Sequence, residues 1–176
     1  MQALWARVLA GEANKPGSYS KRTVNLMATL DKDDAQQFAS LCRFGCKYAG
    51  WLPLVYEFEA DVYKQHGITF TVLTHLNDIG LVRFEPLTGF QRTGLQQKFV
   101  VPYFDGFLLV EGPKEKDNSL SLGKVLLSKV GAEIAGLCQL EEVPGFGDYL
   151  IEKWSGQGFT VTRLGPDMQP LGPKNT

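Results

Sequence analysis

The 176-residue chain is 44% hydrophobic and 21% charged, as expected of a soluble globular protein with one domain, or two small domains sharing a core. Its net charge of -1 and pI near 6.1 lack the basic surplus of most nucleic-acid-binding modules, but leave room for a local basic patch. Three cysteines cannot all pair within one chain, nothing resembles a signal peptide, and no apolar stretch approaches the roughly 20 residues of a membrane-spanning helix. These totals predict a cytoplasmic protein and exclude a membrane span.

The first fifty residues predict three short helices joined by short loops. The first helix covers Gln2–Ala13 and carries one apolar face. No capping side chain precedes it, which suggests that the chain starts inside a longer protein; the alternative is a native Met1 with a frayed first turn. Three such helices are expected to bury their apolar faces against one another as an antiparallel bundle.

The second and third helices have N-cap signals. Ser20 is expected to cap a helix over Lys21–Leu30, because its hydroxyl can accept a hydrogen bond from the first turn. Asp31 is expected to cap a helix over Lys32–Lys47, whose acidic first turn suits the positive end of the helix dipole.

The segment Gly67–Glu85 is the one around which the rest of the chain is expected to pack. Apolar residues recur there at helical spacing: Ile68, Val72, Leu76 and Ile79, with Phe70 and Leu73 widening the stripe. Gly80 should end this helix, and residues 81–85 alternate as a strand does. A preceding helix within Glu57–Gln65, then the central helix, a strand and a hairpin, is the order of a winged helix.

The hairpin itself is predicted over Gln97–Glu111, with Asp105 and Gly106 at the turn. Pro102 cannot donate to a strand ladder, so it places the first hairpin strand at a sheet edge or a bulge. Before the hairpin, Glu85–Leu95 holds the turn residues Pro86, Gly89 and Gly94, and after it Gly112–Leu122 is polar and charged and is expected to be exposed.

The last third of the chain alternates between predicted strands and helices. The expected elements are a strand at Gly123–Leu127, a helix at Lys129–Leu137 capped by Ser128, a helix at Asp148–Ser155 and a strand at Phe159–Leu164. The sequence therefore predicts an α+β fold: a three-helix cluster (1–50), a winged-helix-like unit with a β-hairpin, closing helix and terminal strand (51–164), and a flexible tail (165–176).

Several motifs resemble a bacterial family known only as domain of unknown function 2806. They are LWARVLAGE at Leu4–Glu12, PGSYSKRT at Pro16–Thr23, LMATLDKDDAQQF at Leu26–Phe38, LNDIGL at Leu76–Leu81 and LLSKVGAEI at Leu126–Ile134. The first motif is fairly specific, whereas the last two are common to many winged-helix proteins. The resemblance implies a bacterial protein but supplies no reaction, cofactor or catalytic residue. Similar helix motifs occur in proteins associated with abortive phage infection, which is an analogy only.

The cysteines offer a candidate metal or redox site. Cys42 and Cys46 are four residues apart on the third predicted helix, so both would point the same way. With Cys138 and a histidine they could form a zinc site, but structural zinc sites usually show two closely spaced cysteine pairs. Because buried cysteines behave as small hydrophobes, core packing is favoured and no metal site is predicted.

His66 and His75 are the two side chains that are ready general bases near neutral pH. His75 lies opposite the apolar stripe, beside Thr71 and Asp78, and such neighbours on one helix do not make a catalytic site without a substrate pocket. The segment 145–147 lacks the third glycine and the preceding strand of a phosphate-binding loop. An exposed polar face is favoured, and we predict no catalytic residue, cofactor or small-molecule ligand.

Nucleic-acid binding is the alternative given closest weight. The candidate base-reading residues on the central helix and the candidate phosphate contacts on or near the wing are Thr71, Thr74, His75 and Asn77, with Arg83, Arg92 and Lys98. The helix carries no arginine or lysine, and Asp78 would repel phosphate. The leading expectation is therefore a non-enzymatic interaction or regulatory domain that contacts a protein partner or self-associates. A DNA-binding regulator comes second, and an accessory domain of an enzyme or phage-defence protein, with its active part upstream, comes third.

Overall fold

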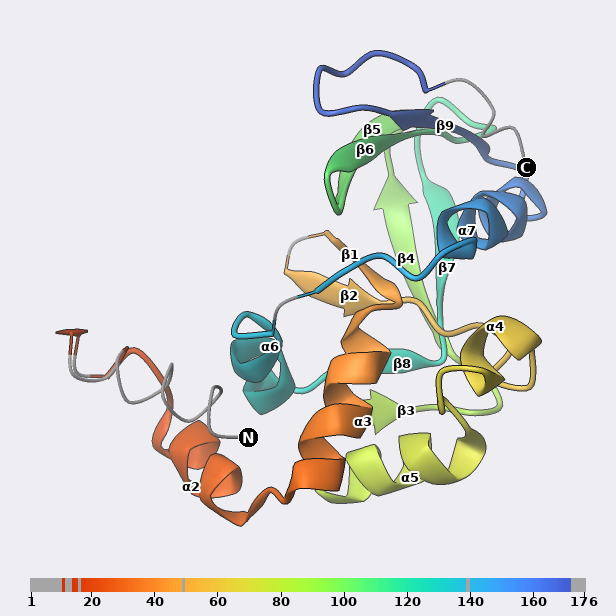
Figure 1. The fold of residues 1–176 in the computed structure, drawn as a ribbon. Helices are drawn as coiled ribbons and strands as arrows, with labels where there is room; N and C mark the ends of the chain where they lie inside the picture. The colour runs from red at the N-terminus through yellow and green to blue at the C-terminus, as the bar shows by residue number, and fades with distance from the viewer. Residues whose placement is uncertain (1–10, 12–13, 16, 49, 139, 172–176) are drawn as a thin grey trace.

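The computed structural model describes residues 11, 14–15, 17–48, 50–138 and 140–171, and shows helices and strands mixed in an α+β fold (Figure 1). The helices are α2 (Lys21–Thr29), α3 (Lys32–Cys42), α4 (Asp61–Lys64), α5 (Phe70–Asp78), α6 (Lys129–Ala135) and α7 (Phe146–Ser155). The strands are β1 (Gly45–Lys47), β2 (Trp51–Pro53), β3 (Val82–Phe84), β4 (Phe90–Leu95), β5 (Lys98–Tyr103), β6 (Gly106–Glu111), β7 (Asn118–Gly123), β8 (Val125–Leu127) and β9 (Thr160–Leu164). The α+β class predicted from the sequence is confirmed, while the helix expected over Gln2–Ala13 falls almost entirely outside the described residues.

Helices α2 and α3 begin at the predicted caps. The Ser20 hydroxyl accepts a hydrogen bond from the Thr23 amide at 3.2 Å. The Asp31 carboxylate accepts one from the Asp34 amide at 2.8 Å, and the Asp34 carboxylate accepts one from the Asp31 amide at 3.2 Å. This reciprocal pair satisfies two backbone donors that the first turn of a helix otherwise leaves without partners, so it fixes where α3 starts.

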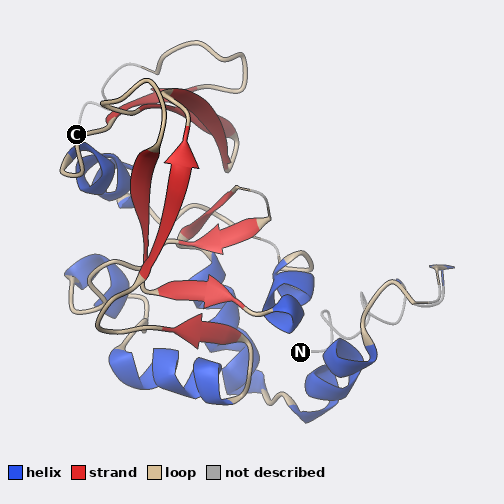
Figure 2. Ribbon diagram, turned by 180° about the vertical axis from the view of Figure 1, so that it is seen from behind, coloured by secondary structure: helices blue, strands red, loops and turns tan. Residues whose placement is uncertain are grey.

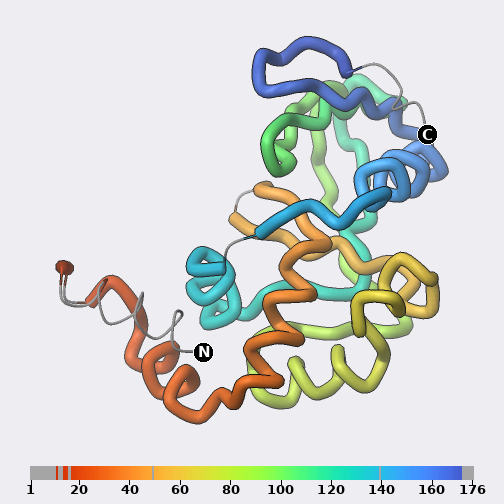
Figure 3. Tube along the Cα trace, in the orientation of Figure 1, coloured from red at the N-terminus to blue at the C-terminus, as the bar shows by residue number. Residues whose placement is uncertain are grey.

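The helices of the N-terminal part find partners far along the chain. Helix α3 packs against α5 and β2, whereas α2 packs against α6 and lies to one side of the molecule (Figure 3). The Glu133 carboxylate of α6 accepts hydrogen bonds from the Ser20 amide at 3.0 Å and the Thr23 hydroxyl at 2.6 Å. The sequence predicts that α2 and α3 pack against each other in an antiparallel bundle. Instead, these polar contacts hold α2 against α6.

Helix α3 is shorter than predicted. It ends at Cys42 instead of Lys47, and residues 45–47 form β1, which pairs antiparallel with β2. A Cβ atom at Gly45 would lie 2.6 Å from the Leu52 carbonyl oxygen, so this close approach of β1 to β2 requires glycine. The four-residue spacing of Cys42 and Cys46 fits a helix and does not indicate a strand. The prediction that both thiols lie on one helix is wrong, because Cys46 lies on β1.

Helix α5, the predicted centre of the fold, forms as expected. The Thr69 hydroxyl accepts a hydrogen bond from the Val72 amide at 3.3 Å and caps the helix. Gly80, at φ +81°, turns the chain into β3, since that backbone conformation strongly favours glycine. Leu73 and Leu76 are fully buried beneath the helix. The short helix α4 precedes α5 inside the predicted range Glu57–Gln65.

The long strands β4 and β7 link the lower and upper parts of the molecule as it is drawn in Figures 1 and 2. Strand β3 pairs antiparallel with β8, and β4 pairs antiparallel with β7, so that the chain leaves along β3 and β4 and returns along β7 and β8 (Figure 2). Strands β4 and β7 lie largely in the segments Glu85–Leu95 and Gly112–Leu122, which carried no predicted strand. The expectation that Gly112–Leu122 is exposed is wrong at Asn118 and Leu120, which are buried. Most of β4 is exposed and its register is interrupted, which hid the apolar alternation of a strand.

The predicted hairpin is present as β5 and β6, and β9 adds to β6 as a third strand. Pro102 lies on β5, an edge strand of this sheet, as predicted. The turn is shifted by one residue: Phe104 and Asp105 form it, with Phe104 at φ +47°, and Gly106 pairs with Tyr103. A Cβ atom at Gly106 would overlap the Leu164 carbonyl oxygen of the segment that packs there.

Helix α7 and β9 close the fold over the core. A single cluster of buried side chains runs from α2 and α3 to α7, with Trp154, Tyr63 and Tyr103 among its largest members. After β9 the chain turns back along the strand, since the Leu171 amide donates to the Arg163 carbonyl oxygen at 2.9 Å. The predicted tail thus begins with an ordered turn, and residues 172–176 lie outside the described part.

Candidate interaction surface

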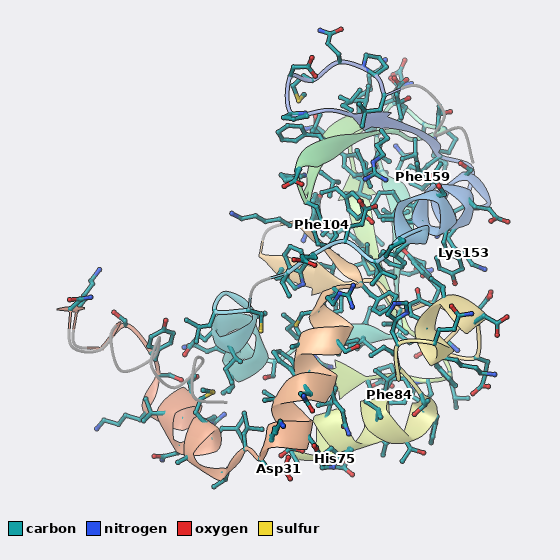
Figure 4. All side chains as sticks on the ribbon, viewed as in Figure 1. Asp31, His75, Phe84, Phe104, Lys153 and Phe159 are labelled. Carbon is teal, nitrogen blue, oxygen red and sulfur yellow. The ribbon has the colours of Figure 1, made fainter. Side chains whose placement is uncertain are left out.

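His75 is held by an acidic residue of α3. Its Nε2 atom lies 2.6 Å from the Asp34 Oδ1 atom, which links α5 to the first turn of α3. Figure 4 labels His75 on α5, near Asp31 at the start of α3. The His75 side chain is 46% exposed, whereas that of Asp34 is 12% exposed. The hydrogen bond from His75 lowers the pKa of the Asp34 carboxyl, an effect that burial opposes and the Asp31 amide reinforces. One of the four candidate base-reading side chains, although partly exposed, is therefore engaged with another part of the fold.

This pair predicts how stability depends on pH. Because the folded-state pKa of Asp34 is depressed, its contribution is fully present above the unfolded value of about 3.9 and is lost as the pH falls through the folded value. Asp34→Asn should lower the free energy of unfolding by about 1–2 kcal/mol at pH 7, and its deficit relative to wild type should shrink below about pH 4. Urea unfolding between pH 7 and pH 3 measures this difference, with Asp33→Asn controlling for the loss of one charge. A deficit that stays constant down to pH 3 would contradict the assignment.

Asn77 is engaged in a second local contact. Its side-chain oxygen accepts a hydrogen bond from the Phe84 amide at 3.1 Å, which ties the end of α5 to β3. Thr71 is exposed and Thr74 is half-buried, on the same helix. Two of the four candidate base-reading residues therefore hold the fold together, and the two threonines remain at the surface of α5.

The three candidate phosphate contacts lie on three successive strands. The Arg83 guanidinium of β3 lies 5.6 Å from the Phe90 ring centroid, and that of Arg92 on β4 lies 5.4 Å from the Tyr48 ring centroid. Lys98 of β5 forms an ion pair with Glu111 at 3.0 Å. Arg92 and Lys98 line one surface hollow, and Arg83 is not among its lining residues.

An aromatic cluster at the start of α5 was not singled out from the sequence. The rings of Phe58, Phe70 and Phe84 have centroids 5.5–5.7 Å apart, each packed against the other two. The Lys124 ammonium lies 5.0 Å from the Phe58 centroid. Phe70 is 48% exposed, and Leu87, in the turn after β3, is 93% exposed. The sequence places Phe70 in the apolar stripe of this helix, and no local signal separates it from the buried positions Leu73 and Leu76.

The cysteines and His66 do not gather into a metal site. Among the residues that the structure describes, no group of three or more histidine, cysteine, aspartate or glutamate side chains could hold a metal ion. The ring of His66 packs edge-on against Phe44, with centroids 5.4 Å apart. Cys46 lies on β1 and Cys42 ends α3, so the two thiols belong to different elements.

The described residues define an α+β protein with one continuous core, and the aromatic cluster, of which Phe70 is exposed and Phe58 and Phe84 are partly buried, is its candidate contact surface. The chain belongs to the family described as Protein of unknown function (DUF2806), whose model matches residues 1–151, and the resemblance seen in the sequence is confirmed. That match ends within α7 and does not include β9. No curated protein and no solved structure matches the chain.

The length and polarity of the helices bear on membrane association. Of the helices in the described ranges, none has both the length and the apolar character needed to cross a bilayer. The longest of them, α3, has 11 residues.

Proposed function

We propose that this chain is a non-enzymatic interaction domain of a cytosolic bacterial protein, and that it acts through protein–protein contacts. The observation that carries the proposal is the character of the α5 surface. The helix contains no lysine or arginine, its polar residues His75 and Asn77 are engaged with Asp34 and the β3 backbone, and it opens with a half-exposed Phe70. A surface of this kind suits an apolar partner better than a phosphate backbone.

The element order supports the same proposal. Helices α4 and α5 follow strands β1 and β2 and lead into β3, which pairs antiparallel with β8. Two helices before an antiparallel pair of strands is the order of a winged helix. We interpret the long β4–β7 ribbon between β3 and β8 as its wing. Because winged helices also serve as docking and dimerisation units, this likeness fits a protein partner, although fold alone does not assign function.

The contact chemistry follows from the aromatic cluster. Phe70, Phe84 and Phe58 form a packed apolar surface whose outer part is accessible, and Leu87 adds an almost fully exposed apolar side chain nearby in sequence. Buried aromatic anchors supply most of the energy in protein interfaces. The partner is therefore expected to offer apolar side chains, together with a carboxylate for the Lys124 ammonium beside Phe58.

The proposal predicts that the double variant Phe70→Asp/Leu87→Asp loses its partner. We expect the tagged wild-type chain to self-associate or to capture a partner protein, and the variant to bind at least about 10-fold more weakly. Sedimentation velocity measures self-association, and affinity capture followed by titration measures the partner. Val100→Asp is the matched control, since Val100 is 40% exposed on β5, in a different sheet. A wild-type chain that is monomeric and captures nothing, or a variant that binds equally well, would overturn the proposal.

DNA binding is the second candidate, favoured by the hollow that contains Arg92 and Lys98. Tyr48 and Phe99 also line this hollow, with ring centroids 6.0 Å apart, so cations and aromatic faces occur together. A gel shift on mixed duplex DNA at several salt concentrations separates the two candidates. Salt-sensitive binding that Arg92→Ala and Lys98→Ala abolish would favour DNA, and no binding at low salt removes it.

A further inference from the structure

A surface hollow lies between the end of β1 and the strands β4 and β5, and contains none of the residues of the aromatic cluster at α5. Its volume is about 260 Å³, just below the roughly 300–1,000 Å³ of most small-molecule sites. We call it the Arg92 hollow, and its lining residues are Tyr48, Arg92, Thr93, Gly94, Leu95, Gln96, Lys98 and Phe99. A smaller apolar hollow shares Arg92 and Phe99 with it and is also lined by the buried side chains of Leu120 and Trp154. Charged and apolar groups therefore line one space of small-ligand size.

Two aromatic rings line the Arg92 hollow. The centroids of the Tyr48 and Phe99 rings lie 6.0 Å apart, and the ring planes are inclined by 52°. Both side chains are half-buried, and because of this inclination neither ring covers the face of the other. The faces of aromatic side chains stack with any nucleobase, since every base has a π-face of its own. The hollow thus offers an apolar, aromatic surface to a planar ring.

The charge of the hollow favours an anion. The Lys98 ammonium forms an ion pair with the Glu111 carboxylate at 3.0 Å. Arg92 is exposed, its guanidinium lies 5.4 Å from the Tyr48 ring centroid, and no carboxylate among the described residues forms an ion pair with it. A guanidinium presents its N–H donors in a planar fork that matches the oxygens of a phosphate. Arg92 is therefore placed to bind a phosphate group beside the two rings.

A β-bulge lies directly beside Arg92. In the register of β4 with β7, Thr93 and Gly94 together lie opposite the single residue Ser119. Gly94 has φ +71°, and nothing lies within 4 Å of its Cβ position, so the backbone here borders open space. A bulge leaves its extra residue unpaired in the strand ladder, and bulges are frequent next to binding sites. Backbone groups of Thr93 and Gly94 are therefore available for hydrogen bonds to the edge of a bound ring.

We propose that the Arg92 hollow binds one nucleoside monophosphate. The base packs on the Tyr48 and Phe99 rings, the phosphate binds the Arg92 guanidinium, and the bulge at Thr93 and Gly94 contacts the edge of the base. A single nucleotide fits better than a strand, because strand binding uses a row of cations along successive phosphates and this hollow has one cation without an ion pair among the described residues. The sequence predicts no small-molecule ligand, since Tyr48 is distant from the other lining residues in the chain.

The test is isothermal titration of the full chain with the 5′-monophosphates of adenosine, guanosine, cytidine and uridine. We expect at least one of them to bind with a Kd below about 1 mM. Its nucleoside alone and inorganic phosphate alone should each bind at least about 10-fold more weakly, because each makes only half of the contacts. Arg92→Ala should weaken binding at least about 10-fold. Phe99→Leu, which keeps an apolar side chain but removes the ring, should weaken it at least about 5-fold.

Arg83→Ala is the matched control. The Arg83 guanidinium also lies against an aromatic ring, 5.6 Å from the Phe90 centroid, but Arg83 does not line the hollow. Its replacement should therefore leave the affinity for the nucleotide unchanged. Circular dichroism of each variant shows that it folds, so that a loss of binding reports on the hollow.

Four results would overturn the proposal. The first is a wild-type chain that binds none of the nucleotides with a Kd below about 1 mM. The second is inorganic phosphate binding as tightly as the nucleotide, which would make the hollow a simple anion site. The third is an equal loss of binding in Arg83→Ala and Arg92→Ala, which would place the nucleotide elsewhere. The fourth is an oligothymidylate of about 12 nucleotides binding at least about 100-fold more tightly than any monophosphate, which would identify a nucleic-acid strand as the ligand.

Discussion

Trp154→Ala is expected to lower the free energy of unfolding by about 3–5 kcal/mol, one of the two largest effects that the structure predicts. Trp154 lies on α7 and is 1% exposed. Its indole N–H donates to the Tyr56 hydroxyl at 2.6 Å, and that hydroxyl donates to the Ser121 carbonyl oxygen of β7 at 3.1 Å. The substitution would leave a large cavity and remove the donor to a buried hydroxyl, so the packing and hydrogen-bonding costs add.

Urea unfolding followed by circular dichroism measures this loss, with two variants as controls. Trp154→Phe keeps most of the ring volume and removes the N–H, so it should cost about 1–2 kcal/mol. Ser155→Ala changes the exposed neighbour on α7 and should stay within about 0.5 kcal/mol of wild type. If Trp154→Ala costs less than about 1 kcal/mol, α7 does not close the core in the way described.

Gly131→Ala is the second large effect and has the opposite sign to that expected from helix propensity. In an ordinary helix interior this change stabilises by about 1 kcal/mol. Here a Cβ atom at Gly131 of α6 would overlap the Leu81 carbonyl oxygen. That carbonyl already accepts a hydrogen bond from the Ser128 amide at 3.0 Å, and the Ser128 hydroxyl donates to the Gly80 carbonyl oxygen at 2.7 Å, so α6 cannot easily withdraw.

We expect Gly131→Ala to destabilise the fold by about 3 kcal/mol or more, or to yield insoluble protein. The matched control is Gly136→Ala at the end of the same helix. Gly136 has φ -62°, and the nearest atom to its Cβ position lies at 3.5 Å, which is ordinary contact. Gly136→Ala should therefore be neutral or stabilising by about 0.4–1 kcal/mol. Equal effects of the two substitutions on the thermal midpoint would show that α6 does not pack closely on the Leu81 backbone.

The sequence predicted well those features that depend on neighbouring residues. Ser20, Asp31 and Ser128 were identified as N-caps because each acts on an amide only three residues away, and all three accept that hydrogen bond. Gly80 was identified as a helix stop because its positive φ is a local requirement. The hairpin was found by its alternation, with an error of one residue at the turn, where Phe104 adopts the conformation expected of a smaller residue.

Predictions failed where the partner is distant in the sequence. No strand is predicted at β4 or β7, because each is stabilised mainly by pairing with the other, across the whole β5–β6 hairpin. Helix α3 was extended to Lys47 because nothing local reveals the pairing of β1 with β2. The exposure of Phe70 could not be predicted either, since it depends on where Phe58 and Phe84 lie in space.

By itself, the sequence determined the family, the α+β class, the helix starts and the central helix of this protein, because caps, glycine stops and apolar periodicity act over a few residues. Only the tertiary structure decided which side chains meet. It paired His75 with Asp34, 41 residues away, and it placed Ser20 and Thr23 against Glu133 of α6. These contacts depend on how α3, α5 and α6 pack together, and that packing is set by the shared core, which no short stretch of sequence specifies.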